Sequence, residues 1–165
     1  MVDEVVRESN RKSAVGPRFL SLGGKLTEQC GWQQVESFIS AEQEIRSVQE
    51  GVGLSDLSPL TKIDLRMKDP VTAWPLLFPE NPVLSEFGKP GYHLIQRDHI
   101  KSHPVLVART ARENFFITSL SGVAPTIEQS IRETVAGGGV SVTDVTSGYS
   151  AFELSGPSAT FVLQK

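Results

Sequence analysis

The stretch GVGLSDLSPLTKIDL, residues 51–65, is the most informative part of this chain because it joins a helix to a strand through a polar turn. The segment before it, residues 40–50, carries helix signals at both ends. Ser40 occupies an N-cap position and Gln43 follows three residues later, as in a capping box. Gly51 stands where a left-handed residue commonly ends a helix. The sequence therefore predicts a capped helix that stops at Gly51.

The segment after the turn has the pattern of a half-buried strand. Over residues 61–67, apolar residues alternate with charged ones, which is the period of a strand with one buried face. Asp56, Ser58 and Thr61 then lie where polar groups can face a cleft. Asp56 and Ser58 can hydrogen-bond a ligand there, or they can bond to nearby backbone groups and stabilise the turn, as such residues commonly do. The residues alone leave both interpretations open.

The remaining predicted elements come in a mixed order. They are a short helix opened by Asp69 and interrupted by Pro75, strands at residues 91–97, 104–109 and 114–119 that form a meander, a helix at 124–136, a hairpin of strands 140–145 and 150–155, and a short helix that starts at Gly156. Helices and strands do not alternate regularly. We therefore expect an α+β fold, with helices on a mixed or antiparallel sheet.

Composition is that of one globular domain. The chain has 165 residues, of which 39% are hydrophobic and 21% charged, and its formal charge is −3. No basic stripe favours nucleic acid or an anionic membrane surface, and no apolar run approaches the length of a membrane span. The single cysteine, Cys30, excludes a disulfide framework within the chain, and the three histidines show no zinc spacing. We expect a cytoplasmic protein without a metal. Residues 1–17 are expected to form a flexible tail and residues 18–165 the domain.

The order of three motifs resembles a known family. They are LGGKLTEQCGW at residues 22–32, VGLSDLSPLTKIDL at residues 52–65 and VTDVTSGYSAFELSGPSATFVLQK at residues 142–165. Together they resemble the N-terminal half of the folate-binding domain of the glycine cleavage T-protein (aminomethyltransferase) family. The last motif is similar to the dimethylglycine dehydrogenase and sarcosine oxidase branch. The resemblance runs from about Phe19 to Lys165.

The resemblance implies tetrahydrofolate as the cofactor. In the family, an acidic residue after a Gly-Gly turn orients the reacting nitrogen of the folate, since a carboxylate there can assist proton transfer. By strand order that turn corresponds to residues 98–104, where this chain has neither the glycine pair nor the paired acids. Asp98 precedes that position, and His99 and His103 are more often solvated than catalytic in such a turn. The catalytic residues are therefore unknown.

The resemblance also implies four cofactor-binding residues. Asp56 and Ser58 would hydrogen-bond a pterin edge. Leu60 would pack against the ring, at a place where the cleavage enzyme has a His-Met pair and this chain has Pro59-Leu60. Ser119 stands where the family often has an asparagine at the edge of the cleft. We expect these residues to line one folate site.

Two functions are consistent with the resemblance. The first is a T-protein-like domain that handles tetrahydrofolate-linked one-carbon units from small amines. This domain would be incomplete alone, since the apolar Phe161, Val162 and Leu163 come just before the last residue of the chain. A homodimer or a larger enzyme would then complete it, and no activity is expected of the chain by itself. The alternative is a non-catalytic subunit or interaction module, similar to the small folate-domain-like subunit of sarcosine oxidase.

Overall fold

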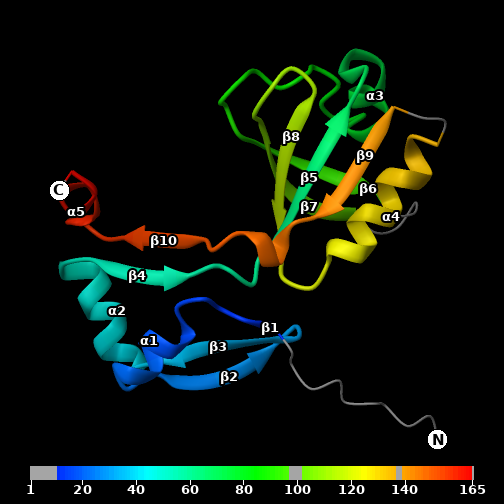
Figure 1. Cartoon of the computed structure of the whole chain (residues 1–165). Helices are drawn as coiled ribbons and strands as arrows, with labels where there is room; N and C mark the ends of the chain where they lie inside the picture. Colours follow the sequence, from blue (N-terminus) through cyan, green and yellow to red (C-terminus); the bar gives the residue numbers. More distant parts are fainter. Residues whose placement is uncertain (1–10, 97–101, 137–138, 165) are drawn as a thin grey trace, which may run out of the picture. The chain divides into compact units, whose positions relative to one another are not determined.

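The computed structural model describes residues 11–96, 102–136 and 139–164. The chain divides into two compact units (Figure 1). Unit 1 comprises the described residues of Met1–Pro59 and Ser150–Lys165, and unit 2 comprises those of Leu60–Tyr149. The polar turn of the 51–65 stretch therefore marks the passage from one unit to the other.

Unit 2 is built on a five-stranded antiparallel sheet. Its elements are β5 (Thr61–Met67), α3 (Pro70–Leu77), β6 (Gly91–Gln96), β7 (Ser102–Arg109), β8 (Asn114–Ser119), α4 (Ala124–Thr134), β9 (Val140–Asp144) and the 3₁₀ turn η1 (Thr146–Gly148). The strands lie in the order β6-β7-β8-β5-β9, and every pairing is antiparallel. The predicted meander of β6, β7 and β8 is confirmed.

The core of unit 2 lies between this sheet and the helices α3 and α4. Alternate residues of β5 point into it, so Ile63, Leu65 and Met67 are fully buried. Trp74 of α3 and Ile127 of α4 are also fully buried and belong to the same cluster. Alternation along the strand and helical spacing in α4 thus produce one continuous apolar core.

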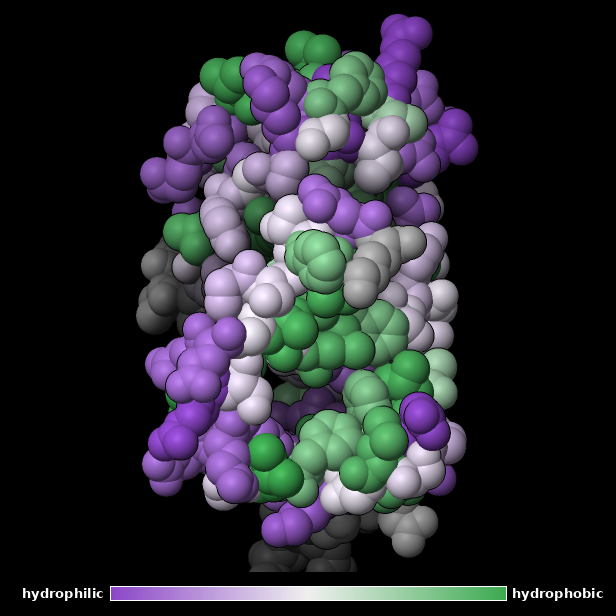
Figure 2. Space-filling view, turned by 90° about the vertical axis from the view of Figure 1, so that its left-hand side faces the viewer, coloured by the Kyte–Doolittle hydropathy of each residue, from purple (hydrophilic) through white to green (hydrophobic). Residues whose placement is uncertain are grey.

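Unit 1 contains two smaller sheets. Its elements are β1 (Arg11–Lys12), α1 (Gly16–Ser21), β2 (Lys25–Gln29), β3 (Trp32–Ser37), α2 (Ala41–Glu50), β4 (Gly53–Asp56), β10 (Phe152–Ser155) and α5 (Ala159–Leu163). One sheet has the order β1-β3-β2, and β4 pairs with β10 in a two-stranded antiparallel ribbon. Figure 2 shows apolar surface where α5 faces the viewer, and the exposed apolar residues of that helix are Phe161, Val162 and Leu163. The α+β class is confirmed.

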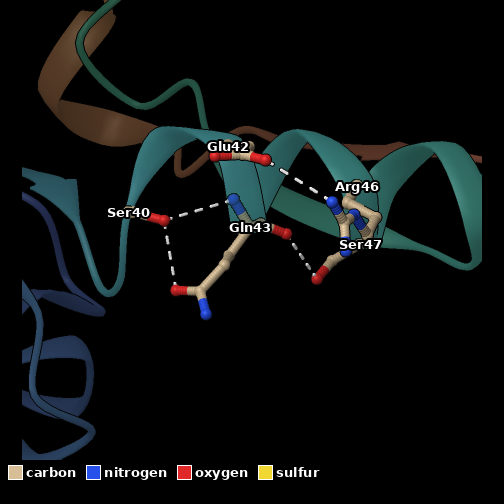
Figure 3. Close-up of polar contacts among 5 residues, drawn as sticks. All are labelled: Ser40, Glu42, Gln43, Arg46 and Ser47. Carbon is tan, nitrogen blue, oxygen red and sulfur yellow. Dashed lines mark hydrogen bonds and ion pairs between the residues drawn. The ribbon is translucent and has the colours of Figure 1, made fainter.

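The predicted helix of residues 40–50 is α2, and its N-terminal cap is confirmed (Figure 3). The Ser40 hydroxyl oxygen accepts from the Gln43 backbone N–H at 3.3 Å, and the hydroxyl donates to the Gln43 side chain at 3.1 Å. The predicted left-handed stop is wrong, because Gly51 has φ −142°. A glycine is needed at another position, Gly156, which has φ +117°. A side chain would not fit there, because a Cβ atom would lie 2.5 Å from the Gly51 carbonyl oxygen.

Three other predictions differ from the structure. The expected hairpin of residues 140–155 is wrong, because β9 pairs with β5 of unit 2 and β10 with β4 of unit 1. The helix α3 continues through Pro75, which lies inside it. Of the expected 1–17 tail, residues 1–10 lie outside the described residues, whereas β1 pairs in parallel with β3 and α1 begins at Gly16.

Candidate ligand-binding groove

Two of the four predicted binding residues meet in unit 2. Leu60 directly precedes β5 and Ser119 ends β8, and the antiparallel register sets Thr61 opposite Ser119. Leu60 and Ser119 therefore lie beside each other although 59 positions separate them in the sequence. They line a groove of about 290 Å³, called here the unit 2 groove. Its lining residues are Leu60, Tyr92, Pro104, Val105, Leu106, Thr118, Ser119 and Leu120.

Three lining residues of the unit 2 groove carry hydroxyl groups, Tyr92, Thr118 and Ser119, and that of Ser119 is held in one orientation. The Ser119 hydroxyl donates a hydrogen bond of 2.6 Å to the Pro104 carbonyl oxygen. Since that hydroxyl has a single proton, its oxygen can act toward a ligand only as an acceptor. The groove therefore suits a ligand that presents an N–H or O–H group at this point.

The walls of the unit 2 groove are mostly apolar. Tyr92 of β6 is 84% exposed, so its ring is available for stacking against a ligand. Leu120 is also mostly exposed, and Leu60 is half-buried. A mostly apolar groove with a few placed polar groups is typical of sites for small ligands.

The other two predicted binding residues lie in unit 1. The Asp56 carboxylate accepts from the Ser58 backbone N–H at 2.9 Å, and the Ser58 hydroxyl oxygen accepts from the Ala151 N–H at 3.2 Å. Ser58 is buried, whereas Asp56 is half-buried. Both side chains therefore make the turn-stabilising contacts that were the alternative to ligand binding. The unit 2 groove is formed by residues of unit 2 alone.

A buried histidine was not predicted by the sequence reasoning. His93 of β6 is only 8% exposed, and its ring contacts those of Trp74 and Phe78 at centroid distances of 5.1 and 4.7 Å. Burial disfavours the charged imidazolium, so the pKa of His93 is lowered. The alternation of His93 with Ile95 along β6 was the available signal.

The turn of residues 98–104, where the family has its acidic residue, is described only in part. Asp98 and His99 lie outside the described residues, and His103 lies in β7.

A second groove adjoins the first. It is also about 290 Å³ and shares Tyr92 and Pro104 with the unit 2 groove. Its floor includes His93 and Phe78, and Glu80 stands at its side. Tyr92 therefore lies between the two grooves. Only the unit 2 groove is lined by the predicted residues Leu60 and Ser119.

The described residues contain neither a metal-ligand cluster nor a membrane-spanning helix. Within residues 11–96, 102–136 and 139–164, no group of three or more His, Cys, Asp or Glu side chains could hold a metal ion. No helix in the same ranges is long and apolar enough to cross a membrane.

The sequence of this chain matches one protein family. The model of the family described as the GCVT N-terminal domain matches residues 16–165. This match covers most of the chain, so the chain belongs to that family. It is a member of the class of domains found at the N-terminus of aminomethyltransferase-type proteins. Among curated proteins no significant match was found.

Solved structures share the fold. The crystal structure of glycine cleavage system aminomethyltransferase T from Bartonella henselae matches with a TM-score of 0.83 and 18% identity, over 93% of this chain and 43% of that chain. Heterotetrameric sarcosine oxidase from Corynebacterium sp. U-96, in complex with pyrrole 2-carboxylate, matches with a TM-score of 0.51 and 17% identity, over 74% of this chain and 60% of that chain. At these identities the likeness establishes the fold. The chain spans less than half the length of the aminomethyltransferase.

Proposed function

We propose that this chain supplies the folate-handling groove of an aminomethyltransferase-type domain, and that the bicyclic ring of tetrahydrofolate binds in the unit 2 groove. The observation that carries the proposal is the meeting of Leu60 and Ser119 in one apolar groove. Leu60 and the exposed ring of Tyr92 would pack against the faces of the ligand ring. The Ser119 oxygen would accept from an N–H group at its edge.

The unit 2 groove has residues that could bind a folate, but its described lining residues include no group that could carry out the transfer. Transfer of a one-carbon unit to a folate nitrogen requires a group that orients the amine and moves its proton. None of the described residues that line the unit 2 groove carries a carboxylate. We therefore propose that residues 18–165 form the N-terminal part of a larger folate-binding domain. A homodimer or a larger enzyme would complete it.

Binding by the chain alone is expected to be weak. The unit 2 groove, at about 290 Å³, lies at the lower limit of ordinary ligand sites, so it would enclose only part of a folate. Calorimetry with 5-formyltetrahydrofolate should give a dissociation constant no tighter than about 100 μM, roughly −5.5 kcal/mol. A low-micromolar constant would show that the chain already holds a complete site.

Substitutions in the unit 2 groove test whether the ligand binds there. Leu60→Glu should weaken binding at least tenfold, because it places a charge against the ligand ring. Leu76→Glu is the matched control, since Leu76 is an exposed leucine of α3 outside the unit 2 groove. Ser119→Ala should weaken binding less, with Ser141→Ala on β9 as its control. Equal binding by Leu60→Glu and Leu76→Glu would refute the site.

The second candidate function is a non-catalytic interaction module. The exposed apolar residues of α5 favour it, because apolar faces of this kind commonly mark interaction surfaces. The two functions make different predictions for the isolated chain. The interaction module would associate with a partner or a second copy without binding any folate. The folate-handling domain would bind 5-formyltetrahydrofolate in the Leu60-dependent manner described above.

A further inference from the structure

Unit 1 contains a strand edge that has no partner among the described residues. In the ribbon of β4 and β10, Ser55 lies opposite Glu153, and Leu54 lies opposite Leu154. The Leu57 N–H donates to the Ala151 carbonyl, so alternate residues of β4 direct their backbone groups toward β10. The backbone groups of Leu54 and Asp56 therefore point to the opposite side. Within the described residues, no backbone hydrogen bond is made to them.

A groove runs along this same edge. It has a volume of about 390 Å³, and all four residues of β4 line it, whereas no residue of β10 does. The other walls are the end of β3 with the residues that follow it, and one face of α2. The groove, called here the β4-edge groove, therefore lies on the side of β4 away from β10. A strand entering it would meet the unpaired backbone groups.

The β4-edge groove combines an apolar floor with negative charge. Phe19, Val35 and Val48 are among the apolar residues that line it. Glu36, Glu44 and Asp56 also line it, and none of its described lining residues is Lys or Arg. Glu44 accepts from the backbone N–H groups of Phe38 and Ile39, which lowers its pKa and keeps it charged. The groove is thus negatively charged at neutral pH.

The ribbon itself is incomplete as a sheet. Its paired strands have four residues each, and a two-stranded sheet is at best marginally stable in water. Leu54 and Phe152 share one face and are 55% and 44% exposed. A third strand would satisfy the outward backbone groups of β4 and cover apolar surface at the same time.

We propose that the β4-edge groove binds an extended peptide segment of a partner protein, in which apolar residues alternate with Lys or Arg, by adding a strand to β4. The backbone ladder at Leu54 and Asp56 would supply affinity. The apolar floor would take alternate side chains, and the carboxylates would select basic residues between them. This site lies in unit 1 and does not depend on the folate groove of unit 2.

The probe for this site is a synthetic peptide of alternating Val and Lys. It should bind the protein, as measured by fluorescence anisotropy, and shift the NMR amide signals of Leu54 and Asp56. Two matched peptides test the two parts of the proposal. Glu in place of Lys should weaken binding at least tenfold, because it sets like charges together. A central Pro should also weaken it at least tenfold, because it removes a ladder donor.

Two pairs of variants locate the binding edge. Leu54→Pro removes an outward N–H from β4 and leaves the bonds to β10 intact, so it should abolish peptide binding. Leu154→Pro makes the same change on the outer edge of β10 and should bind as the unchanged protein does. Glu36→Lys should weaken binding, whereas Glu28→Lys on β2 should not. The second pair requires no backbone change and tests the site even where a proline variant fails to fold.

Three results would overturn the proposal. The first is equal binding of the Lys and Glu peptides, and the second is equal binding by Leu54→Pro and Leu154→Pro. The third is a dimer of the protein without peptide that Leu54→Pro abolishes, which would assign the β4 edge to a second copy of the chain. Sedimentation velocity without peptide measures this last outcome.

Discussion

The two units of the chain bury their apolar side chains to very different degrees. Unit 2 has a continuous core in which fifteen residues of its sheet and helices are buried together. In unit 1, Trp32 and Pro59 are the buried apolar residues among those described. Phe161 and Leu163 of unit 1 are instead exposed. Unit 2 therefore carries its own stability, whereas unit 1 has apolar surface left for other contacts.

The largest expected effect comes from the core of unit 2. Trp74 is fully buried, packs against Phe78 and Phe115, and donates its indole N–H to the Asn81 carbonyl. Trp74→Ala should therefore lower the free energy of unfolding by about 3–5 kcal/mol. Urea denaturation followed by circular dichroism measures the loss.

Trp32→Ala is the matched substitution in unit 1, and we expect it to cost less because Trp32 has no buried apolar cluster around it. The chain has two tryptophans, so each variant retains one as a fluorescent reporter of the other unit. Trp74→Ala should lower the midpoint of unit 2 toward that of unit 1, which the emission of Trp32 reports. A single transition with equal losses in both variants would contradict the difference between the units.

The next effect concerns association through α5. Leu163 is 77% exposed, so a second copy that covers α5 would bury it. We expect a dimer or larger assembly at micromolar concentration, and Leu163→Glu should weaken it at least tenfold, or about 1.4 kcal/mol, by placing a charge in an apolar contact. Light scattering coupled to gel filtration measures the mass. Leu76→Glu on α3 of unit 2 is the control. A monomer at all concentrations would contradict self-association through α5 and leave a different protein as its partner.

Helix caps provide a smaller and more local comparison. Ser40 caps α2 of unit 1 through the Gln43 N–H, and Asp69 caps α3 of unit 2 through the Thr72 N–H. Ser40→Ala should cost about 1 kcal/mol, and Asp69→Ala should destabilise α3 in the same direction. Ser40→Ala should increase amide exchange within α2 without lowering the midpoint of unit 2, whereas Asp69→Ala should lower that midpoint. A loss in both units from Ser40→Ala would mean that the units unfold together.

As pH falls, the stability of unit 2 should decrease before that of unit 1. Burial lowers the pKa of His93, so the unfolded chain binds a proton that folded unit 2 excludes. Stability of unit 2 is therefore full above the ordinary histidine pKa of about 6.5 and falls as pH drops below it toward the lowered value. In unit 1 the pKa of Glu44 is lowered by its bonds from Phe38 and Ile39, so its contribution is lost only at lower pH.

Unfolding midpoints measured from about pH 7 to about pH 5 test this order. His93→Phe should flatten the decline for unit 2, because the neutral ring no longer titrates. Glu44→Gln should leave that decline unchanged. An undiminished decline in His93→Phe would assign it to another group.

The sequence predicted individual elements better than their partners. Alternation in residues 61–67 depends on one buried face, so β5 could be predicted from the residues alone. The same kind of pattern in β9 and β10 could not say that these neighbours join different sheets, because pairing depends on distant strands. The strands β2 and β3 were not predicted, since polar residues dominate both.

The candidate site was predicted in part for the same reason. Leu60 and Ser119 came from family resemblance, and antiparallel pairing of β5 with β8 brings them together. Tyr92 was not predicted, because its place in the groove follows from the pairing of β6 with β7 rather than from any local motif. Asp56 and Ser58 had two open interpretations, and their contacts with Ser58 N–H and Ala151 N–H match the structural one.

Hydrogen exchange of the backbone amides tests the difference between the units most directly. Exchange is slowest where backbone hydrogen bonds belong to a closed core, and fast where a small sheet opens locally. We predict strong protection in β5, β7 and β8, and exchange at least a hundredfold faster, about 2.7 kcal/mol less protection, in β4 and β10. Protection of β4 and β10 equal to that of β5 would contradict the account, because it would show that unit 1 is as stable on its own as unit 2.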